Sequence, residues 1–76
     1  MSEQEWLEMF SNKLVDMMNE AGYSQEEFAR ETGLSQATIS KYINRQQLPG
    51  IKAIISISYA LECSTSELVD FGDTIF

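Results

Sequence analysis

The chain has 76 residues and a formal net charge of −7 at pH 7, from twelve acidic and five basic side chains. We expect a single domain over residues 1–76 and no second catalytic or sensory domain, because this length is near the lower limit for a self-sufficient core. Cys63 is the one cysteine, which excludes an internal disulfide, and the acidic amino-terminal residues do not resemble a secretory signal. No apolar run approaches the ~20 residues of a membrane helix, so the expected location is cytoplasmic with no membrane contact.

The residue inventory offers no chemistry for an enzyme. The sequence has no histidine, Cys63 has no base near it in sequence, and neither a glycine-rich phosphate loop nor a cluster of metal ligands occurs. We therefore expect no catalytic residue, no metal, no cofactor and no small-molecule ligand. For Cys63 the favoured interpretation is a small buried apolar side chain.

The first predicted helix runs from Ser2 or Glu3 to Glu20 and ends at Ala21-Gly22. Acidic side chains near its start favour this assignment, because they lie at the positive end of the helix dipole. One apolar stripe is predicted to face the core: Leu7, Phe10, Leu14, Met17, Met18 and Ala21. Further apolar residues broaden the stripe and either pack against the carboxy-terminal tail, which we favour, or form a partner surface: Trp6, Met9 and Val15.

The second predicted helix begins at Gln25 and is defined by a capping box. Ser24 precedes it and Glu27 lies three residues further on, so the hydroxyl accepts from the Glu27 amide while the carboxylate reaches back. Gly33 ends this helix where a residue that adopts positive φ is needed. Ala29 lies near the expected crossing with the next helix, where a bulky side chain would hold the two axes apart.

The third predicted helix is capped by Ser35 and has two chemically different sides. Ile39, Tyr42 and Ile43 fall at helical spacing and form the inward side. The other side is small, polar and weakly cationic, and consists of Gln36, Ala37, Ser40, Lys41 and Asn44. Two short helices joined by a tight turn, with the outer side of the second left free, have the layout of a helix-turn-helix.

Charge is segregated along the chain. Residues 1–31 carry eight acids and two bases, residues 32–61 carry three bases and no acid, and residues 62–76 carry four acids and no base. The third helix and the loop after it are thus the part of the sequence with positive sign. Two interpretations stay open at this point: a local patch for phosphates, or cations that only keep the surface soluble.

The loop after the third helix contains Pro49, which prevents that helix from continuing. A fourth helix is predicted over Ile51–Glu62, with one apolar side that consists of Ile51, Ile54, Ile55, Ser58 and Leu61. A short fifth helix is predicted from Ser64 or Thr65 through Asp70. An apolar tail follows it, with Phe71, Ile75 and Phe76. Five helices and no strand predict an all-α fold.

In this order, the elements resemble the lambda-repressor-like or Cro family of helix-turn-helix regulators, also called the XRE family. The resemblance covers nearly the whole chain and rests on SQEEFA at 24–29, GLS at 33–35, ISKY at 39–42, Asn44, Pro49, ALECS at 60–64 and Glu67-Leu68. It implies a compact five-helix lambda-repressor-like domain that lays its third helix in the major groove of double-stranded DNA. It also implies a homodimer on a palindromic operator, with half-sites ~34 Å apart.

The resemblance assigns base contacts to the third helix. Gln36 matches a base-reading position, where a glutamine pairs with N6 and N7 of adenine and contributes ~1–3 kcal/mol of discrimination. Ala37 and Thr38 are small enough to approach a thymine methyl group. Ser40 and Lys41 reach a base or the sugar-phosphate backbone.

Phosphate contacts are implied at both ends of the motif, by Gln25 at a helix start and by Asn44 and Arg45 after the third helix. The complete predicted interface is Gln25, Ser35, Gln36, Ala37, Thr38, Ser40, Lys41, Asn44, Arg45 and Gln46. For each residue alone, a solvated polar side chain is the default interpretation, and it is their shared face that favours DNA readout.

Two places depart from the family pattern. Many members carry an arginine late in the first helix and a glutamate late in the third that form a partly buried ion pair, and the corresponding residues here are Met18 and Ile43. Because replacing both partners with packed apolar groups is often neutral or stabilising, we predict that Met18 contacts Ile43. The second departure is Arg45, where the family often has glycine, followed by Gln46 and Gln47 where cations are frequent; these changes bear on the strength of the backbone contact.

The sequence leaves two functions open. The leading hypothesis is a sequence-specific DNA-binding transcriptional regulator, a small repressor that acts by occupying its operator. The alternative is an acidic helix-turn-helix protein-interaction module, antirepressor-like or antitoxin-like, with weak or no DNA binding. If DNA is the ligand, Glu26, Glu27 and Glu31 should point away from the outer side of the third helix. Residues 68–76 and the stripe through Trp6 and Met9 are the candidate dimer surfaces.

Overall fold

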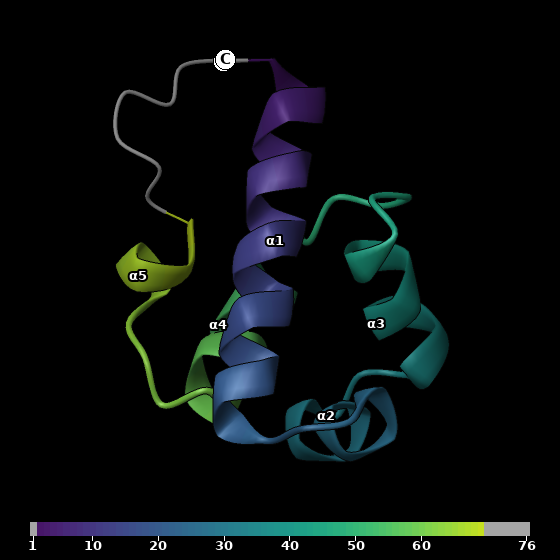
Figure 1. Ribbon diagram of the computed structural model, residues 1–76, viewed down its shortest axis with the longest axis vertical. Helices are drawn as coiled ribbons and strands as arrows, with labels where there is room; N and C mark the ends of the chain where they lie inside the picture. The colour runs from purple at the N-terminus through teal and green to yellow at the C-terminus, as the bar shows by residue number, and fades with distance from the viewer. Residues whose placement is uncertain (1, 70–76) are drawn as a thin grey trace.

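The computed structural model describes residues 2–69, and these residues form α-helices and no strand. The helices are α1 (Glu3–Ala21), α2 (Gln25–Thr32), α3 (Gln36–Ile43), α4 (Ile51–Ala60) and α5 (Thr65–Val69). Figure 1 shows α1 as the long central helix, with α3 and α5 on opposite sides of it and α2 across one end. The predicted all-α five-helix fold is confirmed. The predicted end of the last helix at Asp70 and the apolar tail lie outside the described residues.

One core joins all five helices. Its fully buried side chains come from each helix in turn: Phe10 and Leu14 of α1, Phe28 of α2, Ile39 of α3, Ile57 of α4 and Leu68 of α5. The Tyr42 ring meets Phe10 edge to face, with ring centroids 6.2 Å apart, a geometry that aromatic pairs prefer. No helix of this domain therefore buries its apolar side without the others.

The apolar side of α1 differs in part from the predicted stripe. Trp6 is buried and stacks on Phe10 with ring centroids 5.3 Å apart, so it belongs to the core; the expected contact with the carboxy-terminal tail lies outside the described residues and stays a prediction. Met9 stays 37% exposed. Ala21, predicted to be inward, is exposed at the last turn, whereas the polar residue Ser11 is buried.

Helix α4 is rotated relative to the prediction and ends earlier. Its buried residues are Ala53, Ile57 and Ser58, while Ile51 is 77% exposed and Ile55 is 44% exposed. The helix ends at Ala60 rather than Glu62. The reason is that the segment is apolar almost all round, so its sequence does not single out one face, and packing against α2 and α5 decides which side is buried.

Candidate nucleic-acid interface

The start of α2 is fixed by the predicted capping box. The Glu27 amide donates to Ser24 Oγ at 3.1 Å, and the Ser24 amide donates to Glu27 Oε1 at 3.2 Å. These hydrogen bonds from Ser24 lower the pKa of the Glu27 carboxyl, because they favour its charged form. The helix is thereby held at a defined entry angle beside α3.

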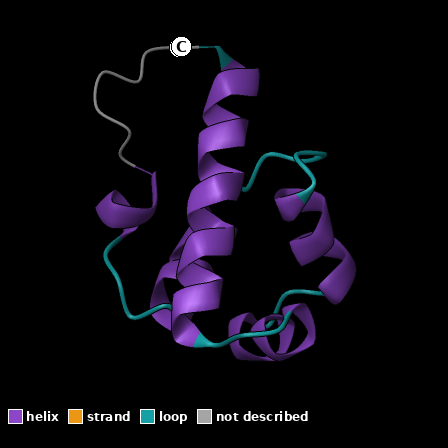
Figure 2. Cartoon of the chain, viewed as in Figure 1, coloured by secondary structure: helices purple, strands orange, loops and turns teal. Residues whose placement is uncertain are grey.

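The turn between α2 and α3 is equally well defined, and Figure 2 shows it as a short loop. Gly33 adopts φ 75° and its amide donates to Ala29 O at 3.0 Å, which closes α2. Thr32 Oγ1 donates to Phe28 O at 2.8 Å and accepts from the Leu34 amide at 3.2 Å. The corner between the two helices is thus rigid rather than a flexible linker.

Two predicted contact residues make the cap of α3. The Thr38 amide donates to Ser35 Oγ at 3.0 Å, and the Ser35 and Thr38 hydroxyl oxygens lie 2.8 Å apart. Ser35 is exposed and Thr38 is half-buried. These hydrogen bonds therefore start the helix, and a contact of Ser35 or Thr38 with DNA stays a prediction.

The outer face of α3, defined here as Gln36, Ala37 and Lys41, is exposed. Ile39 and Tyr42, on the opposite side, are 0% and 3% exposed and anchor the helix to the core. The structure thus has these predicted residues of α3 outward and the predicted apolar pair inward. Figure 1 shows α3 at the edge of the molecule, where a large ligand can reach it.

The carboxyl end of α3 contains Ser40 and Asn44, which bind each other. Asn44 Nδ2 donates to Ser40 O at 2.9 Å and to Ser40 Oγ at 3.2 Å. Ser40 is half-buried and Asn44 is exposed. The amide of Asn44 is therefore oriented by the helix itself before any contact with DNA.

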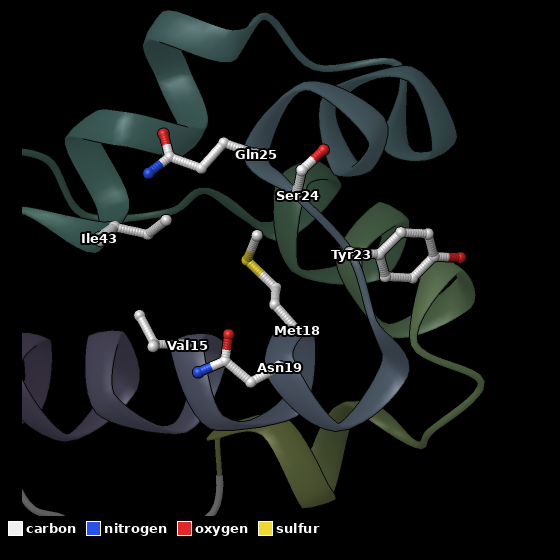
Figure 3. Close-up of a pocket in the computed structure, with 7 residues that line it drawn as sticks. All are labelled: Val15, Met18, Asn19, Tyr23, Ser24, Gln25 and Ile43. Carbon is white, nitrogen blue, oxygen red and sulfur yellow. The ribbon is translucent and has the colours of Figure 1, made fainter.

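Gln25 lines a cavity of about 280 Å³ between α1, α2 and α3. Its lining consists of Val15, Met18, Asn19, Tyr23, Ser24, Gln25 and Ile43. Figure 3 shows the Gln25 side chain reaching from the start of α2 toward α3, and Met18 and Ile43 pointing into the same space. The expected neighbourhood of Met18 and Ile43 is therefore present, and a direct contact between them stays a prediction.

Arg45 is turned away from the outer face of α3. Its Nε donates to Ser11 Oγ at 2.9 Å and its Nη2 donates to Asn12 Oδ1 at 3.0 Å. Both acceptors belong to α1, and sequence reasoning missed them. The available signal was Ser11 itself, a polar residue next to Phe10 inside the apolar stripe.

The end of α3 is a hydrogen-bonded turn in which Arg45 takes the position that glycine usually occupies. The Gln46 amide donates to Lys41 O at 2.8 Å and the Arg45 amide donates to Tyr42 O at 3.2 Å, which is the Schellman pattern. Arg45 has φ 60°, in the left-handed region that side chains seldom adopt. Gln46, predicted as a contact residue, is exposed just beyond this turn.

A rigid corner of two helices, with the second presented to the outside, defines the class of helix-turn-helix proteins. Residues 14–68 match the family model HTH_3, described as helix-turn-helix. The chain belongs to this family of transcriptional regulators, the XRE or Cro/lambda-repressor-like group, and the predicted resemblance is confirmed. It is a family of DNA-binding regulators rather than of enzymes.

Solved structures share the fold. One is the crystal structure of an HTH_3 family transcriptional regulator from Vibrio cholerae, with a TM-score of 0.83 and 24% identity over 88% of this chain. The chain spans 38% of the length of that protein. Another is a hypothetical transcription factor, NHTF, from Neisseria, with a TM-score of 0.82 and 23% identity over 91% of this chain and 79% of that one. No curated protein matches the sequence. None of the helices in residues 2–69 is long and apolar enough to cross a membrane.

Proposed function

We propose that the protein is a sequence-specific repressor that lays α3 in the major groove and acts by occupying its operator. The observation that carries this proposal is the outer face of α3, exposed on a helix that Ile39 and Tyr42 hold rigidly to the core. A face held in this way reaches base edges without an ordering cost at the moment of binding. The proposal includes a single domain over residues 1–76 and action in the cytoplasm.

The side chains on this face divide into readout and positioning. Gln36 reads adenine through its amide, and Ala37 lies against the methyl group of a neighbouring thymine. Lys41 contacts phosphates, and so do the helix start at Gln25 and the amide of Asn44. These contacts set the register of α3 on the DNA. Ser35, Thr38, Ser40 and Gln46 border the same surface and complete it.

The net charge of −7 does not prevent this function, because phosphate neutralisation is local. Residues 32–61 carry no acid, so α3 and its flanking loop meet the DNA without an acidic side chain of their own. The acidic residues elsewhere weaken the long-range attraction. We therefore expect affinity to rest more on base contacts and backbone amides than on a basic patch.

A homodimer on a palindromic operator is part of the proposal. Of the dimer surfaces expected from sequence, Trp6 and Leu68 are buried, Met9 is 37% exposed, and residues 70–76 lie outside the described residues. Helix α4 instead exposes Ile51, Ile55 and Tyr59, at 77%, 44% and 81%, and their spacing puts them on one side of the helix. We propose that a second copy covers this side, with the two α4 helices antiparallel.

Charge favours a second copy on this surface. Each protomer carries −7 overall, and two such bodies repel at most orientations. Helix α4 contains no acid, and its single charge is Lys52, so contact along α4 keeps the acidic regions of both copies apart. In an antiparallel pair Ile55 lies near the twofold axis, and Ile51 of one copy faces Tyr59 of the other, which is a self-complementary contact.

Selection from random double-stranded DNA by the purified protein, at about 50 mM salt, tests the proposed function because phosphate contacts are strongest at low salt. We expect enrichment of a palindrome whose half-sites are ~34 Å apart. Absence of any enriched sequence overturns the proposal. In that case the acidic protein-interaction module is the function that remains.

A further inference from the structure

Arg45 combines an unusual backbone conformation with an unusual side-chain contact. Its φ of 60° is one that glycine would adopt without strain. Its guanidinium, however, donates to Ser11 at 2.9 Å and to Asn12 at 3.0 Å. Arginine at this position therefore has a backbone strain that glycine would avoid, and it gains two hydrogen bonds to α1.

The hydroxyl oxygen of Ser11 on α1 is oriented to accept this hydrogen bond. Ser11 is 2% exposed, and its hydroxyl donates to Glu8 O at 3.0 Å, so its lone pairs face Arg45. A buried hydroxyl needs such a partner, because burial removes it from water. Two parallel donors from one planar guanidinium also fix direction, which a single flexible contact does not.

The contact lies just beyond the carboxyl end of α3. Ile39 and Tyr42 anchor the helix to the core, Tyr42 against Phe10 of α1, and the Ser35 cap defines its start. Beyond Tyr42, Asn44 is exposed and binds Ser40 of its own helix. Arg45 therefore adds a polar connection to α1 beyond the apolar contact that Tyr42 makes with Phe10.

We propose that Arg45 is a positioning residue that sets the orientation of α3 on the operator, rather than a ligand of DNA phosphate. This inference rests on the proposed DNA-binding function. Because the guanidinium is held by α1, Lys41 supplies the cation that α3 offers to phosphates. The sequence-based expectation that Arg45 contacts phosphate is thereby replaced.

Stability measurements test the contact without DNA. Glu62 is the matched control, because it also has a positive φ, 54°, and ends α4 in the same hydrogen-bonded turn. We expect Glu62→Gly to raise the Tm, since it only relieves backbone strain, and Arg45→Gly to lower it, since it removes the hydrogen bonds to α1 as well. An equal rise in Tm for both variants overturns the proposal.

DNA binding separates a positioning role from a phosphate contact. We expect Arg45→Ala to weaken binding to the selected duplex by about 3- to 30-fold, with the dependence of log K on log salt unchanged. Arg45→Lys should behave like Arg45→Ala, and the Arg45→Ala/Ser11→Ala double variant should bind no worse than Arg45→Ala. Lys41→Ala is the contrast, because loss of one phosphate contact in each protomer lowers the slope by about 0.9 per protomer, about 1.8 for the bound dimer.

Each other outcome has a defined meaning. A slope lowered by about 0.9 per protomer in Arg45→Ala, about 1.8 for the bound dimer, with full binding by Arg45→Lys and Ser11→Ala, makes Arg45 a phosphate ligand and overturns the inference. Ser2→Ala removes the α1 capping box far from α3; if it weakens binding as much as Arg45→Ala, loss of stability explains both and the inference also fails. If the wild type selects no duplex, both the proposed function and the positioning role of Arg45 are overturned. If the wild type selects a duplex and Arg45→Ala binds it equally well, only the positioning role is overturned.

Discussion

At the scale of single residues, α3 separates the buried side chains that fold the protein from the exposed side chains that we propose contact DNA. Ile39 and Tyr42 are buried, whereas Gln36 and Lys41 are exposed. The sequence predicts this division well, because helical spacing assigns each residue to a side. It does not predict the Arg45 contact, because Ser11 and Asn12 lie 34 and 33 residues away in the chain and no local rule connects them.

Gln36 is expected to carry specificity rather than general affinity. Gln36→Ala should remove discrimination at one base pair of each half-site, worth ~1–3 kcal/mol, and leave the preference at other positions unchanged. Competition binding with single-base variants of the selected duplex measures this. Equal weakening on every sequence, random DNA included, would contradict a readout role.

Lys41 is expected to carry the opposite pattern. Lys41→Ala should weaken binding to all sequences alike and lower the salt slope by about 1.8 for the bound dimer, because it removes one neutralised phosphate from each protomer at about 0.9 apiece. Titration of binding against salt concentration gives the slope. Ala37→Ser, on the same face but without a charge, is the control and should leave the slope as it is.

At the scale of elements, the ends of helices are predicted more reliably than their orientation. Ser24, Ser35 and Gly33 act through atoms a few residues away, and the structure has each cap where the sequence indicates it. The face of α4 is different, because Ile51 and Ile55 lie on one side of the helix and Ala53 and Ile57 on the other. Neighbouring helices decide which side is buried, so the prediction was wrong for Ile51 and Ile55, whereas Ser58 is buried and Ile54 and Leu61 pack against the core.

The capping box of α2 makes stability depend on pH. Hydrogen bonds from Ser24 lower the pKa of Glu27 in the folded protein. A carboxyl whose folded pKa lies below its unfolded value stabilises the fold above the unfolded pKa, and this contribution is lost as the pH falls through the folded pKa. When the pH is lowered from neutral to below the ordinary pKa of glutamate, the free energy of unfolding should therefore fall less for Glu27→Gln than for the wild type.

Urea unfolding at a series of pH values measures this difference. Ser24→Ala removes the other half of the box and should cost about 1 kcal/mol at neutral pH. Glu26→Gln, one residue earlier and outside the box, is the control and should keep the wild-type profile. A Glu27→Gln variant whose stability follows the wild-type pH dependence would show that the cap does not couple to protonation.

At the scale of the whole molecule, one small core supports both the outer face of α3 and the exposed side of α4. Every helix contributes a fully buried side chain. The net charge of −7 is unusual for a DNA-binding domain, yet the chain belongs to a family of DNA-binding regulators. Segregation of the acids away from residues 32–61 fits this family better than the total charge does, because phosphate neutralisation is local.

The proposed dimer gives a prediction at this scale. Ile55→Glu places a charge near the twofold axis, where the two copies would bring like charges together, and should give a monomer by sedimentation equilibrium. Helical content and Tm at low protein concentration should stay near wild type, because Ile55 is 44% exposed. Met9→Glu, at another exposed apolar residue, is the control and should remain dimeric. A wild type that is monomeric at all concentrations would exclude the α4 interface.

The division of labour within α3 has a further consequence for how such a regulator changes over time. Gln36 and Ala37 are exposed and take no part in the core. Under the proposed function, exchanging them would redirect the protein to a new target without a folding penalty. Variation at these two sites, with Ile39 and Tyr42 unchanged beneath them, would then be the least demanding route to a regulator of a different set of genes.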